Sequence, residues 1–369
     1  MTSLKSFLSR LPKAALIYGA CWVLILILGV LSGISLADML SDALRRFGMW
    51  GILVLSMIPT IKAGIGPNFA LPVGVCCGLF AMVNTIELRF PGWGGATNQY
   101  AAWIEFLIAS IGSALFFALA LGYIVGIVMN AVKGFEMAVA LLIGFATTFY
   151  FSIIWLTHSN SSAYLHVFGS GLRSVINLSH FGVDGIFDDS LRFSLIGVEI
   201  RTGTLFVVLI ACFFMWLLFQ SRAGAFISSG TNESRVAACV ISTILAAFGT
   251  IVYSQGLILA DIGFSSNIQD IGFIVLYDSP LMMAFPAVAA ILIGGAGINN
   301  AKIIHVIVGT LILQGLIANG TMVFDNMLDM TNARGWIVID STNHAILMLA
   351  QNAIILCALI KYSVAPPIK

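Results

Sequence analysis

Histidine and carboxylate side chains are the groups of this chain most able to act as metal ligands, acids or bases. Its histidines form no HExxH sequence and no pair four residues apart on one predicted helix, which is the spacing of zinc ligands on a helix. They are His158, His166, His180, His305 and His344. His344 lies close to Asp340, so a hydrolytic or metal site remains an alternative there, although hydrogen bonding alone also explains the pair. GxSxG and the ATP-binding GxxxxGK[ST] are both absent from the sequence, which therefore predicts neither an enzyme nor an ATP site in this chain.

Neutral polar side chains within the apolar runs suit a different chemistry, the hydrogen bonding of an uncharged solute. They include Thr147, Thr148, Gln314, Gln351 and Asn352, with Asn319 nearer the end of its run. Ion-coupled transporters carry ionisable groups deep in their spans, and no such group is found here. Lys62 is the one charge near a span interior, and its long side chain can extend to the headgroups. Energy for any uphill transport must therefore come from another chain.

A run of glycine and proline interrupts one apolar segment, in "IKAGIGPNFALPVGV" from Ile61 to Val75. Proline removes a backbone donor and clashes with the preceding turn, so these residues cannot all lie in one unbroken helix. The run is either a turn between two spans or a discontinuous helix that lines a solute path, and the two are compatible if the turn enters the membrane. The predicted path residues are Gly64, Gly66, Pro67, Asn68, Phe69, Gln314 and Asn319. A similar stretch at 286–303 indicates two pseudo-repeated halves.

Long apolar runs dominate the chain, which is 60% hydrophobic and only 9% charged. Soluble domains carry about 25% charged residues, so this composition predicts an integral membrane protein. We expect an all-α fold: one polytopic domain over residues 1–369, with about ten transmembrane helices, one or more of them broken. The predicted spans are about 14–35, 48–63, 68–86, 105–129, 136–156, 204–220, 236–254, 281–297, 303–323 and 341–361. The amphipathic segment 36–47 is expected to lie along the membrane interface instead of crossing it.

Charge is distributed unevenly between the two sets of connections. With the N-terminus inside, the inner pieces carry ten Lys or Arg and two acids, and the outer pieces carry seven Lys or Arg and fourteen acids. The positive-inside rule therefore predicts that both termini are cytoplasmic. The outer segments 87–104, 157–203 and 255–280 are long enough to form partly structured caps or a docking surface.

One inner connection, Gln220 to Val236, is longer and more polar than the others. It is either a solvated loop or a docking surface through which a partner ATPase drives the protein. The predicted coupling residues are Arg222, Gly224, Ser229, Gly230, Thr231, Asn232, Glu233 and Arg235. Its small residues would let another backbone approach closely, and Thr231 or Asn232 could cap a helix that begins at about Ser234.

Three stretches resemble the permease subunits of bacterial ABC importers, in the family that serves simple sugars, nucleosides, autoinducer-2 and branched-chain amino acids. They are "SMIPTIKAGIGPNFALPVGV", "SGTNESRVAACVISTILAAFGTIVYSQ" and "AFPAVAAILIGGAGINNAKIIHVIVGTLILQGLI". The likeness extends, with gaps, over most of residues 14–362. This chain has Gly66–Asn68 where the family has an acidic residue, and its 220–236 connection is shorter than expected.

The resemblance implies a multi-pass subunit in the bacterial cytoplasmic (inner) membrane that moves a small neutral solute, most simply a sugar or nucleoside. Its implied partners are cytoplasmic ATPase subunits, a second permease chain as homodimer or heterodimer, an extracytoplasmic substrate-binding protein and membrane lipid, with no nucleic acid. This chain would hold no cofactor, and the ATPase partner would bind ATP and Mg. Branched-chain amino acids or flavin- or purine-like compounds are alternative cargoes, and a stand-alone secondary transporter or channel is an alternative class.

Overall fold

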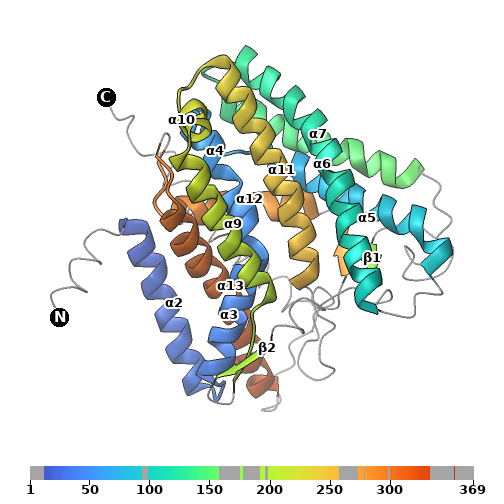
Figure 1. Cartoon of the computed structure of the whole chain (residues 1–369). Coiled ribbons are helices and arrows are strands. Elements are labelled where there is room, and N and C mark those ends of the chain that lie inside the picture. The colour runs from blue at the N-terminus through green and yellow to red at the C-terminus, as the bar shows by residue number, and fades with distance from the viewer. Residues whose placement is uncertain are drawn as a thin grey trace.

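Helices make up most of the part of the chain that the structure describes (Figure 1). The structure is a computed structural model and describes residues 12–93, 99–157, 175–177, 192–195, 198–256, 273–277, 279–297, 300–332 and 353. Its helices are α2 (Lys13–Leu31), α3 (Leu36–Leu55), α4 (Met57–Lys62), α5 (Leu71–Trp93), α6 (Gln99–Ala131), α7 (Glu136–Thr157), α9 (Gly203–Gln220), α10 (Arg222–Ile227), α11 (Asn232–Gly256), α12 (Ser279–Ile293) and α13 (Ile303–Asn332). Four short strands form two antiparallel pairs, β1 (Val175–Asn177) with β4 (Phe273–Val275) and β2 (Arg192–Leu195) with β3 (Val198–Arg201).

Seven helical segments in the described ranges are long and apolar enough to cross a membrane. They are α2, the Leu36–Lys62 segment made of α3 and α4, the Trp103–Ala131 part of α6, α7, α9, α11 and the Ile303–Phe324 part of α13. Two further apolar helices are shorter, Leu71–Glu87 in α5 and the whole of α12. The predicted helical membrane architecture is therefore confirmed. The count of ten spans is not confirmed, and the predicted span 341–361 lies outside the described residues except for position 353.

The segment 36–47 is not a separate interfacial helix, so that expectation is wrong. α3 begins at Leu36 and continues through the segment to Leu55. Its apolar side chains Met39, Ala43 and Phe47 are buried against other helices. Asp42 pairs with Arg45 at 3.0 Å and with Arg46 at 3.2 Å, so these charges are paired on the helix itself. An amphipathic pattern fits a protein-facing helix as well as a lipid-facing one, and here it is protein that α3 contacts.

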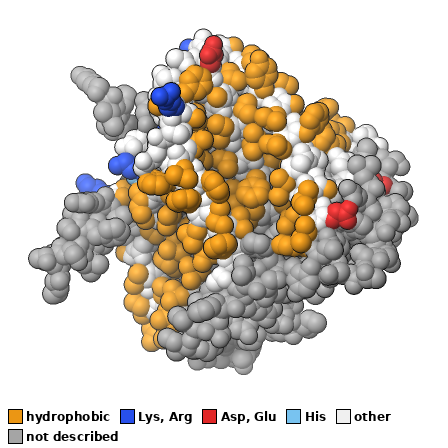
Figure 2. Space-filling model, in the orientation of Figure 1, with side chains coloured by type: hydrophobic (Ala, Val, Ile, Leu, Met, Phe, Trp, Pro, Cys, Tyr) orange, Lys and Arg blue, Asp and Glu red, His pale blue; other side chains and the backbone are white. Residues whose placement is uncertain are grey.

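α3, α5, α11 and α12 occupy the interior, and α2, α6, α7 and α9 lie around them. In the most apolar 18-residue stretch of the Leu36–Lys62 segment, 83% of the residues are buried. In the corresponding stretch of α2 only 11% are buried. α3 packs against α13, α11 and α9, and α11 packs against α6, α5 and α3. Large apolar side chains such as Phe116 on α6, Phe149 on α7 and Phe214 on α9 are exposed. The face in Figure 2 is accordingly mostly hydrophobic, with Lys, Arg, Asp and Glu toward its margins, as a lipid-facing surface requires.

Two pairs of glycines, each four residues apart, bring α5 and α6 close to α11. A Cβ on Gly78 of α5 would lie 2.6 Å from the carbonyl oxygen of Ala247, and Gly74 faces Ala246. On α6, a Cβ on Gly126 would lie 2.8 Å from the Cα of Val236, and Gly122 faces Val240 in the same way. Small residues at this spacing are how membrane helices approach closely and gain van der Waals contact.

All the connections predicted to be cytoplasmic that the structure describes gather at one end of the bundle, here named the α10 end. Pro12, before α2, lies against Gly295 in the α12–α13 connection, and the α4–α5 connection lies beside Ser228 and Gly230. The α6–α7 turn contacts the start of α11 through Asn130 and Asn232. Connections that are far apart in the sequence therefore lie at the same end of the bundle.

Candidate functional site

The interruption between α4 and α5 is a defined turn followed by a buried segment. α4 ends in a Schellman motif: the Gly64 N–H donates to the Ile61 carbonyl at 3.1 Å and the Ile65 N–H to that of Thr60 at 3.0 Å. Gly64 has a φ of 77° and Gly66 a φ of 95°, in the left-handed region that glycine adopts most easily. Gly64 is exposed, whereas Gly66 and Pro67 are buried and Phe69 is half-buried. The glycines predicted as path residues thus first serve to reverse the chain.

Asn68 anchors this segment deep inside the bundle. Its Nδ2 donates to Ser242 Oγ of α11 at 2.8 Å, and its Oδ1 accepts from the Ala70 N–H at 3.0 Å. Ser242 is ten residues beyond the first residue of α11, which at 1.5 Å per residue is about 15 Å along the helix. The Phe69 carbonyl likewise faces Gly144, eight residues into α7. The interruption is therefore a turn that begins at the α10 end and enters the bundle between α7 and α11. That it lines a solute path stays a prediction.

Asn68→Ala is expected to destabilise the chain by about 2 kcal/mol, because it leaves the Ser242 hydroxyl and the Ala70 N–H without partners in a buried setting. Thermal unfolding of the purified chain in detergent measures this loss. In a double-mutant cycle with Ser242→Ala, the combined loss should be clearly smaller than the sum. Additive losses would show that the bond between Asn68 and Ser242 is not made.

α12 ends in a second Schellman motif at Gly295, which has a φ of 98°. The Gly295 N–H donates to Leu292 at 3.0 Å and the Ala296 N–H to Ile291 at 3.1 Å, as Gly64 and Ile65 do after α4. The two interruptions therefore share a local geometry. The predicted repetition of two whole halves is not confirmed by it.

Gln314 and Asn319, the two predicted path residues of α13, have different surroundings. Both are buried. The Asn319 amide, with its nitrogen toward Met39 and its oxygen toward Trp22, donates to the Met39 carbonyl at 2.9 Å and accepts from Trp22 Nε1 at 2.9 Å. Asn319 therefore ties α13 to α3 and α2. The Nε2 of Gln314 has no hydrogen-bond partner in the described part of the chain.

The connection between α9 and α11 contains the short helix α10 and presents most of its residues at the surface. Arg222, Ser229, Gly230, Thr231, Asn232 and Glu233 are exposed. Thr231 caps α11, since the Ser234 N–H donates to its Oγ1 at 3.3 Å, so the capping prediction is confirmed and the helix begins two residues earlier than expected. Gly224 is buried, because a Cβ there would meet the Leu218 carbonyl and Phe219, and its role is to hold α10 against α9.

Arg235 is the one charged residue of the predicted coupling set that is buried. Its guanidinium pairs with Glu136 Oε1 at 2.7 Å and donates to Asn130 Oδ1 at 3.0 Å and to the Met129 carbonyl at 3.1 Å. Lys133 Nζ donates to Asn232 Oδ1 at 2.6 Å beside it. These contacts fasten the start of α11 to the α6–α7 turn. Arg235 is therefore part of the internal packing. Contrary to the prediction, it is not exposed for docking.

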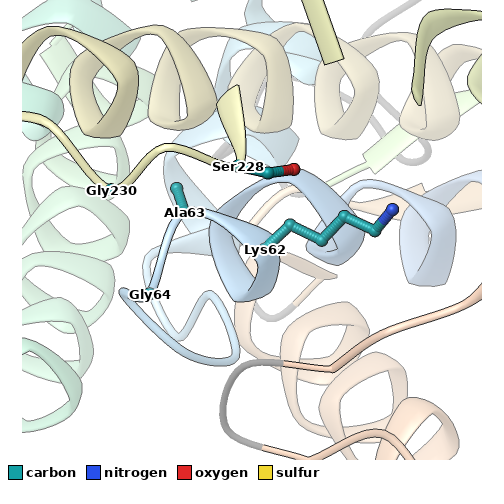
Figure 3. A pocket seen from close by; sticks show the side chains of 5 residues that line it. All are labelled: Lys62, Ala63, Gly64, Ser228 and Gly230. Carbon is teal, nitrogen blue, oxygen red and sulfur yellow. The ribbon is translucent and has the colours of Figure 1, made fainter. Parts of the chain in front are cut away.

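A shallow cavity of about 420 Å³ lies between the interruption at Ile61–Val75 and the connection at Gln220–Val236. Lys62, Ala63 and Gly64 from the end of α4 line one side, and Ser228 and Gly230 line the other (Figure 3). Lys62 Nζ lies 3.8 Å from the centroid of the Phe219 ring of α9, a cation–π contact that keeps the ammonium at the rim. The exposed segment around α10 thus lies directly beside the buried interruption.

Within the described residues, no three His, Cys, Asp or Glu side chains are grouped as metal ligands would be. His305 accepts the Lys302 N–H at 3.3 Å near the start of α13. The other histidines, together with Asp340, Gln351 and Asn352, lie outside the described residues. The sequence did not single out Ser242, Glu136 or Asn130, which make the contacts described above. A polar residue in an apolar run was the one signal available for Ser242.

Comparisons of the sequence with family models and with curated proteins, and of the structure with solved structures, find no match.

Proposed function

We propose that this chain is the transmembrane permease subunit of an ATP-driven importer in the bacterial cytoplasmic membrane. It passes a small neutral solute, a simple sugar or a nucleoside, from an extracytoplasmic binding protein to the cytoplasm. The observation that carries the proposal is the position of α10. It is an exposed short helix at the end of the bundle, packed directly beside the break that leads into the interior.

Energy enters through α10 in this scheme. The sequence has no ATP-binding loop, so hydrolysis must take place in partner subunits. The docking surface comprises the exposed residues Arg222, Ser229, Gly230, Thr231, Asn232 and Glu233, with Phe226 of α10, which is 44% exposed, as its apolar centre. Exposed aromatic side chains at the centre of a polar patch are typical anchors of protein interfaces. A partner that presses on this patch pushes against the end of α4 across the cavity.

The charge distribution supports an orientation with the α10 end in the cytoplasm. Among the described residues, this end carries Lys13, Lys62, Lys133, Arg222, Arg235 and Lys302 against Glu136 and Glu233. The opposite end carries seven acids against five arginines: Asp38, Asp42, Glu87, Glu105, Glu199, Asp325 and Asp329 against Arg45, Arg46, Arg89, Arg192 and Arg201. By the positive-inside rule both termini are then cytoplasmic. A second permease chain completes the complex by covering part of the apolar surface.

Co-purification tests the proposal. The tagged chain, expressed in its native host and extracted in mild detergent, is expected to bring an ATPase subunit with it. Phe226→Ser should reduce the ATPase recovered about tenfold, the loss expected when an interface anchor is truncated. Phe135→Ser serves as the matched control, because Phe135 is 74% exposed on the neighbouring α6–α7 turn and lies outside the proposed surface.

Two outcomes would contradict the proposal. If no ATPase accompanies the wild-type chain, the importer assignment fails and a stand-alone transporter takes its place. If Phe226→Ser and Phe135→Ser recover the ATPase equally well, α10 is not the docking surface.

A further inference from the structure

Two polar side chains on α13 are buried and lack partners. Thr310 is 0% exposed and Gln314 is 2% exposed. Neither Thr310 Oγ1 nor Gln314 Nε2 has a hydrogen-bond partner in the described part of the chain. The residues are four apart, so they lie one above the other on the same face of the helix. Buried polar groups are nearly always hydrogen-bonded, and a pair of exceptions on one helix face requires an explanation.

Other buried threonines in this chain show that Thr310 is not typical of its surroundings. A threonine in an apolar helix can donate to the carbonyl four residues earlier, which satisfies the hydroxyl without any neighbour. Thr85, Thr148, Thr243 and Thr250 do this, at distances of 2.8–2.9 Å. Thr310 does not make the corresponding bond to its own helix. Its hydroxyl is therefore available to a partner that does not belong to the described chain.

The face that Thr310 and Gln314 share points away from the periphery. Ile312 of α13 contacts Gly19 of α2, and Gly315 contacts Trp22. At 3.6 residues per turn, Thr310 and Gln314 are each about 160° around the axis from Ile312. They therefore face away from α2, the most lipid-exposed helix, while remaining buried. Neither a lipid chain nor the α2 interface can be the missing partner.

We propose that Thr310 and Gln314 line the solute path and bind a hydroxyl or carbonyl oxygen of an uncharged solute. The Gln314 amide nitrogen donates to that oxygen, and the Thr310 hydroxyl donates or accepts one turn away. The Ile303–Phe324 segment carries no Asp, Glu, Lys or Arg, so this site offers a charged solute no counter-charge. This inference rests on the proposal that the chain is a solute permease, and it assigns the polar contact within the path to α13.

Cysteine accessibility tests the path without knowledge of the solute. Thr310→Cys and Gln314→Cys are treated in native membranes with 2-hydroxyethyl methanethiosulfonate, a small, uncharged, water-soluble probe, and labelling above that of the parent chain is followed. Leu313→Cys is the control, since Leu313 adjoins Gln314 and is 0% exposed. A thiol in apolar surroundings is poorly ionised as well as hidden, so both path positions should react at least about tenfold faster than the control.

A second measurement separates a path from a structural role. Thr310→Val with Gln314→Leu removes the unpartnered groups and keeps their shape, so the melting temperature should equal or exceed that of the wild type while uptake falls. Thr250→Val, which removes a satisfied hydroxyl, is the matched control and should lower the melting temperature slightly. Labelling no faster than that of Leu313→Cys, or a double variant less stable than Thr250→Val, would overturn the inference. Neither the labelling rate nor the melting temperature depends on an ATPase. This inference can therefore fail while the importer assignment stands, and the importer assignment can fail while this inference stands.

Discussion

Arg235→Met is expected to destabilise the folded chain by about 3–5 kcal/mol, the usual loss when one partner of a buried ion pair is removed. The Arg235 and Glu136 side chains are only 7% and 14% exposed, and the guanidinium also holds Asn130 and the Met129 carbonyl. Without it the Glu136 carboxylate keeps only backbone donors, among them the Gly134 N–H at 2.7 Å. Equilibrium unfolding in detergent micelles measures the change.

Arg45→Met is the matched control for this variant. Arg45 also pairs with a carboxylate, but its side chain is 23% exposed and Asp42 keeps its second partner Arg46. Partly exposed pairs contribute little, so the loss should stay below about 1 kcal/mol. Adding Glu136→Leu to Arg235→Met should recover part of the lost stability, because no unpaired carboxylate remains. Equal losses for Arg235→Met and Arg45→Met would show that Arg235 is not a buried clamp.

Gly126→Leu is the second change for which we expect a large effect. Its Cβ would lie 2.8 Å from the Cα of Val236, so α6 and α11 would have to separate along the contact that the glycines create. Overpacking against backbone costs about 3 kcal/mol, because neither helix can move aside without losing other contacts. We expect a sharp fall in the yield of folded protein, measured as the monodisperse fraction in size-exclusion chromatography after extraction.

Gly112→Leu gives the comparison on the same helix. A Cβ on Gly112 would have no atom within 4 Å, and the residue is exposed. The added leucine side chain would there extend into lipid. The yield of folded Gly112→Leu protein should therefore be close to that of the wild type. A comparable loss of yield in both variants would mean that the added apolar bulk, and not the α6–α11 contact, is responsible.

Helix positions were predictable from this sequence because apolar runs of membrane length have few alternatives. The start of α11 was also predictable, since Thr231 is a residue type that caps helices and the acidic Glu233 lies in the first turn that follows. Both features depend on neighbours in the sequence. The roles of the predicted coupling and path residues mostly remain proposals, because coupling depends on partner chains and transport depends on a solute.

The sequence could not predict features that depend on contacts between residues far apart in the chain. Asn68 and Ser242 are 174 positions apart, so nothing in the local pattern at Gly64–Phe69 shows how far the turn enters the bundle. Arg235 follows a run of exposed residues and has the appearance of a surface charge, but its partner Glu136 is 99 positions away. The amphipathic segment 36–47 fits lipid and protein neighbours equally well, and only the packing of α13 and α11 around α3 distinguishes them.

The glycine contacts along α11 also determine which movements cost least. Gly74 and Gly78 on one side, and Gly122 and Gly126 on the other, present backbone and no interlocking side chains to α11. Surfaces without interlocking side chains can slide along each other by small steps, which is shear motion, more easily than they can separate. Several polar contacts on α11 oppose this sliding: Ser242 with Asn68, Arg235 with Glu136 and Asn130, Asn232 with Lys133, and Gln255 with Trp103. Together these contacts limit the shear, and α5 or α6 could shift along α11 only when all the polar contacts on its own side are released.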